Sequence, residues 1–459
     1  MYNGTTGRGR RREFRLWAML VVALALGSLV WAGCGSSSGG GSNTGGSTEG
    51  GEPAAESSGS DNPGVPQVNV RFGMQPFGDH SIFVTGLTNG WFEDVGINVE
   101  PKPLGKDIPP GKATQELVTN QLDIVTEYAP LAIQDMSQVP DVKMAAFDDI
   151  NYGTFVFANP ELKLETLEER IEGGESLDEA MKKIGEEMKG KSYAIESSGF
   201  HRIFYNTVAK LGGINLNSDL ELSVLEDPQI VQQALGGQLD FASPAGVAQM
   251  VQLFQAGWTP LVSLKTLVEE LPPEESAPML GNTGLQLTES YLNENRETVL
   301  RFLSVMYRII DEIYKDPEKT LEEQATYLAK VSGTEIGAKG LTEVLTEIDP
   351  LTPFDKQAEY WNDKESNLYY TKLYQPQIDE AQKGGVLPKG KNFVPKEVII
   401  AGELYEEMVE LKEEYEKLLK SSDVEGLSGK QKELAEAAAT QYERFNYVDA
   451  VRLIKEATA

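Results

Sequence analysis

The sequence predicts an α/β fold of two related lobes followed by C-terminal helices. Segments typical of strands and helices alternate from residue 68 to residue 158, which indicates a parallel sheet covered by helices. A second alternation, with a similar order of elements, runs from residue 190 to residue 264. From Ser290 onward the sequence is mostly helical, with apolar side chains at helical spacing. We therefore expect two lobes of the same kind and an added helical region.

The first alternation begins with a strand at residues 68–74. Its further elements are a helix at 81–89, a strand at 97–101, a helix at 111–120, and strands at 122–126, 141–147 and 154–158. The second alternation gives strands at 193–196, 220–225, 239–242 and 260–264, with helices at 200–211, 228–235 and 245–255 between them. Further helices are expected at 402–421 and 428–458.

These elements define the expected domains. Lobe 1 is assigned to residues 66–155 plus 260–400 and lobe 2 to residues 156–259, with a charged helical insertion at 161–189. Residues 401–459 form a C-terminal helical extension. The chain is expected to cross between the lobes near residues 151–157 and 257–264.

The composition limits the possible functions. The chain has 459 residues, of which 40% are hydrophobic, so it can build a sizeable core and is not globally disordered. It has 71 acidic and 41 basic residues, and the resulting charge of −30 argues against nucleic acid as a partner. One cysteine, Cys34, and two histidines, His80 and His201, exclude an intrachain disulfide, a cysteine-built metal site and a Cys–His dyad in the mature body. We expect neither a metal nor a cofactor.

Residues 1–33 predict an export signal. A segment with five arginines precedes an apolar run at residues 16–32, which is short for a membrane span. The run ends at Trp31-Ala32-Gly33-Cys34, which resembles a bacterial lipoprotein processing site and implies a lipid on Cys34. Arg11-Arg12-Glu13-Phe14 resembles a twin-arginine signal, so the general secretory and twin-arginine routes both stay open. The alternative is an uncleaved signal-anchor helix, and either reading places the body outside the cytoplasm.

Residues 34–65 predict a flexible tether. They are rich in Gly, Ser, Asn, Thr, Glu and Pro, and such a segment cannot bury apolar surface. Its expected reach is on the order of 30 Å. The sequence therefore predicts a folded body that is joined to its lipid anchor by a short flexible linker.

Four segments resemble a known family. They are residues 89–100 (NGWFEDVGINVE), 116–124 (ELVTNQLDI), 188–195 (MKGKSYAI) and 234–242 (ALGGQLDFA). Their order over about residues 68–400 is similar to that in the solute-binding proteins of bacterial ABC importers for nitrate, alkanesulfonates, taurine and thiamine precursors. The resemblance implies a type II periplasmic binding protein fold, in which two Rossmann-like lobes close about a hinge on one small molecule. It also implies delivery of that molecule to an ABC permease.

The loops at the carboxyl ends of the predicted strands are the expected ligand site. The candidate ligand-binding residues in these loops are Gln75, Phe77, Asp79, His80, Glu127, Tyr128, Tyr152, Glu196, Ser197, Ser198, Gly199 and Ser243. Glu127 and Glu196 stand out because an acidic group directly after a buried strand has few structural reasons to be there. Structural alternatives exist for the others: a serine can cap the following helix, an aromatic ring can belong to the core, and a histidine can be a satisfied structural side chain.

The predicted loops contain carboxylates and aromatic rings but no lysine or arginine. A desolvated sulfonate or nitrate needs cationic or multiple donors, whereas a carboxylate beside an aromatic wall suits a planar or amine-bearing compound. We therefore expect a small nitrogenous organic solute, such as a thiamine-precursor pyrimidine or a related amine. A sulfonate or another anion remains open because residues 197–199 precede a helix N-terminus.

The expected protein is a monomeric solute-binding lipoprotein and not an enzyme. The enzyme alternative within the same fold is a pyrimidine synthase, which is disfavoured because those relatives carry a cysteine cluster and this chain has no cysteine after Cys34. A tethered hydrolase is disfavoured by the lack of a G-x-S-x-G motif. An adhesive or chaperone-like surface protein remains an alternative if no small ligand exists.

Overall fold

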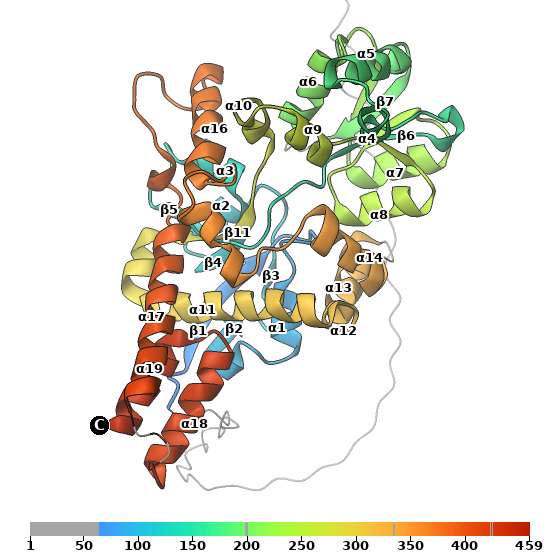
Figure 1. The fold of residues 1–459 in the computed structure, drawn as a ribbon. Helices are drawn as coiled ribbons and strands as arrows, with labels where there is room; N and C mark the ends of the chain where they lie inside the picture. The colour runs from blue at the N-terminus through green and yellow to red at the C-terminus, as the bar shows by residue number, and fades with distance from the viewer. Residues whose placement is uncertain (1–63, 198–200, 334–335, 423, 425) are drawn as a thin grey trace, which may run out of the picture. The chain divides into compact units, whose positions relative to one another are not determined.

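The structure is a computed structural model, and it describes residues 64–197, 201–333, 336–422, 424 and 426–459. The expected signal peptide, Cys34 and nearly all of the expected tether lie outside the described residues. The chain within these ranges forms two sheets with helices packed around them (Figure 1).

The first sheet combines the strands of the first alternation with one later strand. Its order is β2 (Ile97–Glu100), β1 (Val68–Met74), β4 (Ile124–Tyr128), β11 (Thr283–Thr288) and β5 (Val142–Phe147), and the short β3 (Lys106–Asp107) pairs with the end of β1. Strand β1 is parallel to β2 and β4. All residues of β4 and β5 are buried, as expected for strands covered on both faces.

The second sheet has the order β10 (Thr259–Ser263), β6 (Phe155–Ala158), β9 (Phe241–Ser243), β7 (Ser192–Glu196) and β8 (Glu221–Leu225). Strand β7 is parallel to β8 and β9, whereas β6 is antiparallel to both β9 and β10. Strand β10 thus pairs in the second sheet, although the sequence assigned residues from 260 onward to lobe 1.

Both sheets are mixed: each contains the parallel pairs that were expected and also antiparallel pairs that the sequence did not predict. Strand β11 runs antiparallel to β4 and β5, and it was not expected from the sequence. The chain enters the second sheet through β6 and leaves it through β10. Because entering and leaving strands run in opposite directions, their pairing is antiparallel. The two crossing segments also meet, since the Leu264 amide donates to the Thr154 carbonyl at 2.8 Å.

The helices of the two alternations cover the sheets. They are α1 (Phe83–Thr88), α2 (Ala113–Val118), α3 (Ala129–Asp135), α4 (Leu167–Glu172), α5 (Leu177–Met188), α6 (Arg202–Leu211), α7 (Asp227–Leu235), α8 (Val247–Gln255), α9 (Leu264–Glu270) and α10 (Pro273–Ser276). The inserted helices α4 and α5 each start with a capping box, at Thr166 and Ser176. Helix α5 lies directly against the end of α6, because a Cβ on Gly185 would come within 2.0 Å of the Gly212 carbonyl oxygen. The insertion is therefore packed into its lobe.

The remaining helices follow β11. They are α11 (Glu289–Lys315), α12 (Pro317–Thr320), α13 (Glu322–Ser332), α14 (Gly337–Glu343), the π-helical η4 (Val344–Ile348), α15 (Ala358–Trp361), α16 (Tyr370–Gly384), α17 (Ala401–Ser421), α18 (Lys430–Glu443) and α19 (Tyr447–Thr458). Single 3₁₀ turns are η1 (Glu93–Val95), η2 (Pro160–Leu162), η3 (Ala277–Met279), η5 (Phe354–Lys356) and η6 (Pro395–Glu397). The single helix expected at 428–458 is instead two helices, which are separated where Phe445 takes a φ of 62°.

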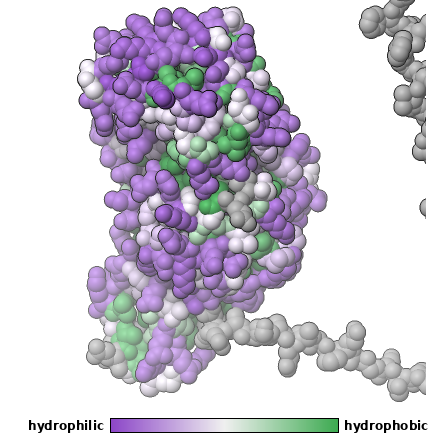
Figure 2. All heavy atoms as spheres, turned by 90° about the vertical axis from the view of Figure 1, so that its right-hand side faces the viewer, coloured by the Kyte–Doolittle hydropathy of each residue, from purple (hydrophilic) through white to green (hydrophobic). Residues whose placement is uncertain are grey.

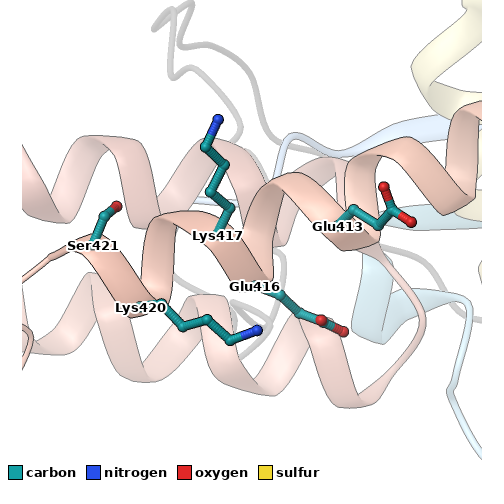
Figure 3. A pocket seen from close by; sticks show the side chains of 5 residues that line it. All are labelled: Glu413, Glu416, Lys417, Lys420 and Ser421. Carbon is teal, nitrogen blue, oxygen red and sulfur yellow. The ribbon is translucent and has the colours of Figure 1, made fainter.

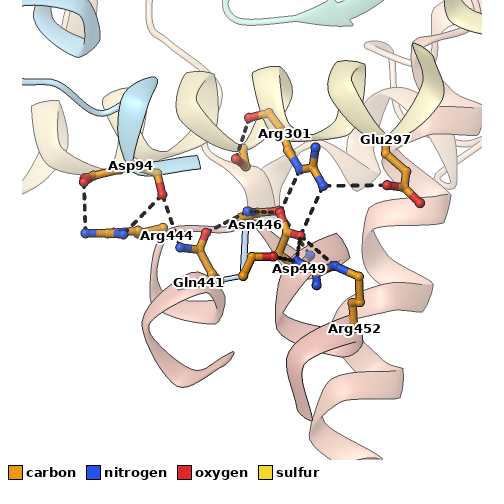
Figure 4. A network of polar contacts seen from close by, with 10 residues as sticks. Asp94, Glu297, Arg301, Gln441, Arg444, Asn446, Asp449 and Arg452 are labelled. Carbon is orange, nitrogen blue, oxygen red and sulfur yellow. Dashed lines mark hydrogen bonds and ion pairs between the residues drawn. The ribbon is translucent and has the colours of Figure 1, made fainter. Parts of the chain in front are cut away.

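Helices α17 and α19 contact β5 and α11, respectively, so the C-terminal helices pack against the first lobe (Figure 1). Asp449 on α19 accepts a 2.7 Å hydrogen bond from Nε of Arg301 on α11 (Figure 4). On the face in Figure 2, hydrophilic side chains predominate and hydrophobic ones form small separate groups. Among the described helices, none combines the length and hydrophobicity needed to cross a membrane.

Candidate ligand-binding cleft

A small cavity of about 40 Å³ lies where residues from both sheets converge. The residues that line it are Phe77, Asp79, His80, Tyr128, Asn151, His201, Ala245, Val247, Thr283 and Asp349. The cavity thus combines aromatic rings, carboxylates and imidazoles.

The sheet topology explains why these residues meet. Phe77, Asp79 and His80 follow the carboxyl end of β1, and Tyr128 is the last residue of the neighbouring β4. Thr283 is the first residue of β11 and pairs with Tyr128 because these two strands are antiparallel. From the second lobe, His201 precedes α6, while Ala245 and Val247 lie at the start of α8. The cavity therefore lies at the strand ends where the sequence analysis expected the ligand.

Two carboxylates line the cavity. Asp79 is 6% exposed, and its Oδ2 accepts a hydrogen bond from the Thr283 hydroxyl at 2.5 Å. Asp349 is 2% exposed, and its Oδ1 accepts hydrogen bonds from the amides of Tyr152 and Gly153 at 2.9 and 2.6 Å. Burial, together with the charge of Asp79, raises the pKa of Asp349 to about 8.

Two further buried aspartates lie beside this pair. Asp149 Oδ1 accepts the Thr283 amide at 2.6 Å, while its Oδ2 and both oxygens of Asp148 lack a hydrogen-bond partner in the described part of the chain. Burial raises the pKa of both carboxyls well above the ordinary value, and the charge of Asp79 adds to the effect. Among the described residues that line the cavity, none is a lysine or an arginine. The site therefore concentrates acidic groups without a cationic side chain of its own.

The two histidines contribute one imidazole from each lobe. His80 and His201 are 4% and 7% exposed, and both line the cavity. The Nδ1 atom of each ring has no hydrogen-bond partner among the described residues. Burial lowers the pKa of both rings, which favours neutral imidazoles at neutral pH. Neutral imidazoles offer a ligand both donor and acceptor positions.

Four of the expected ligand-binding residues line the cavity: Phe77, Asp79, His80 and Tyr128. Glu127 does not, because side chains alternate along β4 and that of Tyr128 takes the cavity side. Glu127 Oε1 instead accepts hydrogen bonds from Gln75 Nε2 at 3.1 Å and from the Tyr128 amide at 2.8 Å. Burial raises the pKa of Glu127 to about 7. Gln75 and Glu127 thus lie beside the cavity as a buried hydrogen-bonded pair.

The other expected residues that the structure describes also lie off the cavity wall. The Ser243 hydroxyl donates to the Phe155 carbonyl at 2.6 Å, which joins β9 to β6. Glu196 is buried and accepts the His201 amide at 3.3 Å, and Ser197 donates to Glu226 at 2.6 Å. Tyr152 is half-buried and contributes its amide to Asp349. Ser198 and Gly199 lie outside the described residues.

Sequence reasoning did not propose Asn151, Ala245, Val247, Thr283 or Asp349, and it treated His201 as a structural side chain. Thr283 belongs to the strand that was not expected. Asp349 precedes Pro350, and an aspartate before a proline is a signal for a turn that could have drawn attention to this position.

A second depression lies on α17 and is shown in Figure 3. Its residues come from neighbouring turns of one helix, carry both signs of charge and are not buried: Glu413, Glu416, Lys417, Lys420 and Ser421. Glu416 is already engaged, since it accepts the Tyr442 hydroxyl at 2.7 Å. We assign no binding role to this depression.

Solved structures of bacterial binding proteins resemble the chain. The periplasmic nitrate-binding protein NrtA from Synechocystis PCC 6803 matches with a TM-score of 0.50 and 15% identity, over 74% of this chain and 88% of that protein. The periplasmic aliphatic sulphonate-binding protein SsuA from Escherichia coli gives a TM-score of 0.49 and 13% identity, over 71% of this chain and 90% of its own. The likeness to NrtA shows that the chain has the two-lobed fold of periplasmic binding proteins, as the sequence predicted.

No curated protein sequence matches the chain. The sequence model of one family does match, over residues 63–325, which include both sheets, helices α11 and α12 and the first residues of α13. This match spans more than half of the chain, so the protein belongs to the NMT1-like family.

Proposed function

We propose that the protein captures a small organic solute outside the cytoplasm and delivers it to an ABC-type permease, without chemical conversion of the solute. Membership of the NMT1-like family and the likeness to periplasmic binding proteins support a binding role. The placement of the cavity supports it further, because residues from both lobes line the same small space. A ligand in contact with both lobes would favour a closed form of the protein.

The proposed solute carries a positively charged nitrogen. One observation carries this part of the proposal: Asp79 and Asp349 line the cavity, Asp148 and Asp149 are buried beside it, and no cationic side chain is among the lining residues. A desolvated anion such as a sulfonate or nitrate would find no cationic side chain among the described lining residues and would make ionisation of the buried carboxyls still more costly. An ammonium or protonated heterocycle would be attracted to the carboxylates, and Phe77 and Tyr128 would provide apolar and aromatic surface.

Native mass spectrometry of the freshly purified full-length protein tests the proposal. We expect a cationic nitrogen compound to co-purify, to be released unchanged and to stabilise the protein when added back. At a ligand concentration 100 times Kd, the stabilisation would be about 2.7 kcal/mol. Conversion of the compound, or preferential stabilisation by taurine, alkanesulfonates or nitrate, would contradict the proposed function.

Membrane attachment through Cys34 is a separate part of the proposal. Replacement of the thiol by a hydroxyl in Cys34→Ser removes the nucleophile that would receive the lipid. We expect this variant to accumulate as precursor or to leave the membrane fraction, as shown by its mass and by cell fractionation. A variant with the mature mass and membrane association of the wild type would refute the lipid anchor.

A further inference from the structure

Asp349 reaches the cavity from a part of the chain that belongs to neither sheet. It follows the π-helical turn η4, and its amide donates to the Val344 carbonyl at 2.7 Å. The residue lies beyond residue 325, where the family match ends, yet its side chain lines the cavity and is 2% exposed. The chain therefore adds a carboxylate to the cleft from its C-terminal half.

This carboxylate is held by the segment that connects the two sheets. Tyr152 and Gly153 lie between β5 and β6, and both of their amides donate to the same oxygen, Oδ1 of Asp349. A Cβ on Gly153 would come within 2.4 Å of the other oxygen, Oδ2, so glycine permits the close approach. One edge of the carboxylate is thus fixed on the crossing segment.

The surroundings of Asp349 are those of a site for a cation. Asp79 lines the same cavity, and Asp149 and Asp148 are buried next to it. His80 and His201 line the same cavity with Nδ1 atoms that have no partner in the described chain, so polar groups besides the carboxylates are available to a ligand. Burial raises the pKa of Asp349, and a cation bound at the carboxylate would offset the cost of ionising it.

We propose that Asp349 determines the specificity of the cleft, by binding the positively charged nitrogen of the solute with its carboxylate. The same carboxylate accepts hydrogen bonds from the amides of Tyr152 and Gly153, so the group that binds the charge is also bonded to the segment between the sheets. This inference rests on the proposed function, since it names the residue that selects the charge of the solute. A purely structural Asp349 would cap the two amides without contributing to ligand choice.

Asp349→Asn separates these two roles, because the amide side chain retains a carbonyl oxygen for the two backbone donors but loses the charge. Asp355→Asn is the matched control: Asp355 is exposed six residues further on, and its replacement makes the same carboxyl-to-amide change outside the cavity. The probes are tetramethylammonium, 1,4-diaminobutane and 5-aminomethylpyrimidine, each compared with a neutral analogue in which carbon or a hydroxyl replaces the charged nitrogen. Binding is measured by isothermal titration calorimetry, and unfolding of each variant by circular dichroism.

We expect the wild type and Asp355→Asn to prefer at least one cationic probe over its neutral analogue. Asp349→Asn should bind that cation about 10- to 100-fold more weakly, because it loses a charge-assisted hydrogen bond of ordinary strength. Its affinity for the neutral analogue should change little. Equal preference for the cation in the wild type and in Asp349→Asn would overturn the role of Asp349 and leave the proposed function intact. A wild type without any preference for the cations would contradict the proposed function itself.

Discussion

At the scale of single residues, the cleft combines carboxyls that are costly to ionise with imidazoles that are costly to protonate. The pKa of Asp349 is raised to about 8 by burial and by Asp79, so the folded protein holds this proton when the unfolded chain has already lost it. Between about pH 4 and pH 8 the folded state therefore binds more protons than the unfolded state, and stability without ligand should fall as the pH rises. In Asp349→Asn, this part of the pH dependence should be lost, as measured by urea unfolding across that range.

Binding of a cation should show the opposite trend with pH. A quaternary ammonium probe keeps its charge at every pH, so only the protein titrates. The titratable groups that line the cavity with Asp349 or are buried beside it are Asp79, His80, Tyr128, His201, Asp148 and Asp149. We expect affinity to increase as the pH rises toward 8, with proton release below that pH, detected by calorimetry in buffers of different ionisation enthalpy. Affinity that is independent of pH, with no proton release, would contradict a carboxylate that ionises on binding.

Glu127 provides a comparison of sequence-based and structure-based expectations. The sequence favoured it as a direct ligand for a cation, whereas the structure places its carboxyl against Gln75 Nε2 and the Tyr128 amide. Glu127→Gln keeps the shape of the side chain, so we expect less than about a threefold change in the affinity for a cationic probe. A loss as large as that expected for Asp349→Asn would restore Glu127 as a direct ligand.

The sequence identified the right loops more reliably than the right side chains. Residues that follow the end of a strand lie at the edge of the sheet whatever their identity. This rule alone correctly predicted four residues that line the cavity: Phe77, Asp79, His80 and Tyr128. Whether a side chain faces the cavity depends on strand alternation, and the adjacent residues Glu127 and Tyr128 therefore point to opposite sides. Asp349 could not be placed at all, because it reaches the site through tertiary packing of a turn that is 200 residues away from Asp149 in the chain.

At the scale of elements, most strands and helices of the two alternations follow from hydrophobic periodicity, and the exceptions have local causes. Strand β11 contains Gly284, where a Cβ would come within 1.9 Å of the Ala146 carbonyl oxygen, so the close approach of β5 requires a residue that weakens the strand pattern. The break between α18 and α19 occurs at Phe445, a residue type that gives no signal for the left-handed conformation it adopts. Pattern alone therefore merged these two helices and missed the strand.

The C-terminal helices are held to the first lobe by a buried ion pair. Arg301 and Asp449 are 3% and 0% exposed, and Arg452 and Asn446 also bond to Asp449 (Figure 4). Asp449→Ala would leave the buried guanidinium without this partner, with only the exposed Glu297 at 3.6 Å. We expect destabilisation by about 3–5 kcal/mol in urea unfolding. The exposed pair Lys432–Glu436 is the control, and Glu436→Ala should cost less than about 1 kcal/mol. Equal effects of the two substitutions would show that the buried pair does not secure these helices.

At the scale of the whole molecule, the arrangement of the cleft predicts closure on the ligand. His201 and Val247 come from the second lobe, while Asp79 and Tyr128 come from the first, so one small molecule can contact both only when the lobes are together. The chain crosses between the sheets at residues 148–154 and again at residues 264–282, and neither crossing is a long continuous helix that would resist bending. Hinged closure of two domains around a ligand is a common response to binding.

Small-angle X-ray scattering with and without a saturating cationic probe measures this closure. We expect a smaller radius of gyration with the probe in the wild type. If closure depends on the contact between the bound cation and the Asp349 carboxylate, the Asp349→Asn variant saturated with the same probe should compact less than the wild type. The Asp355→Asn variant should compact as much as the wild type. The comparison at saturation matters, because a ligand shifts a conformational equilibrium only through its different affinities for the two states. Full compaction of saturated Asp349→Asn would mean that closure depends on contacts other than this carboxylate, and absence of compaction in the wild type would argue against a hinged clamp.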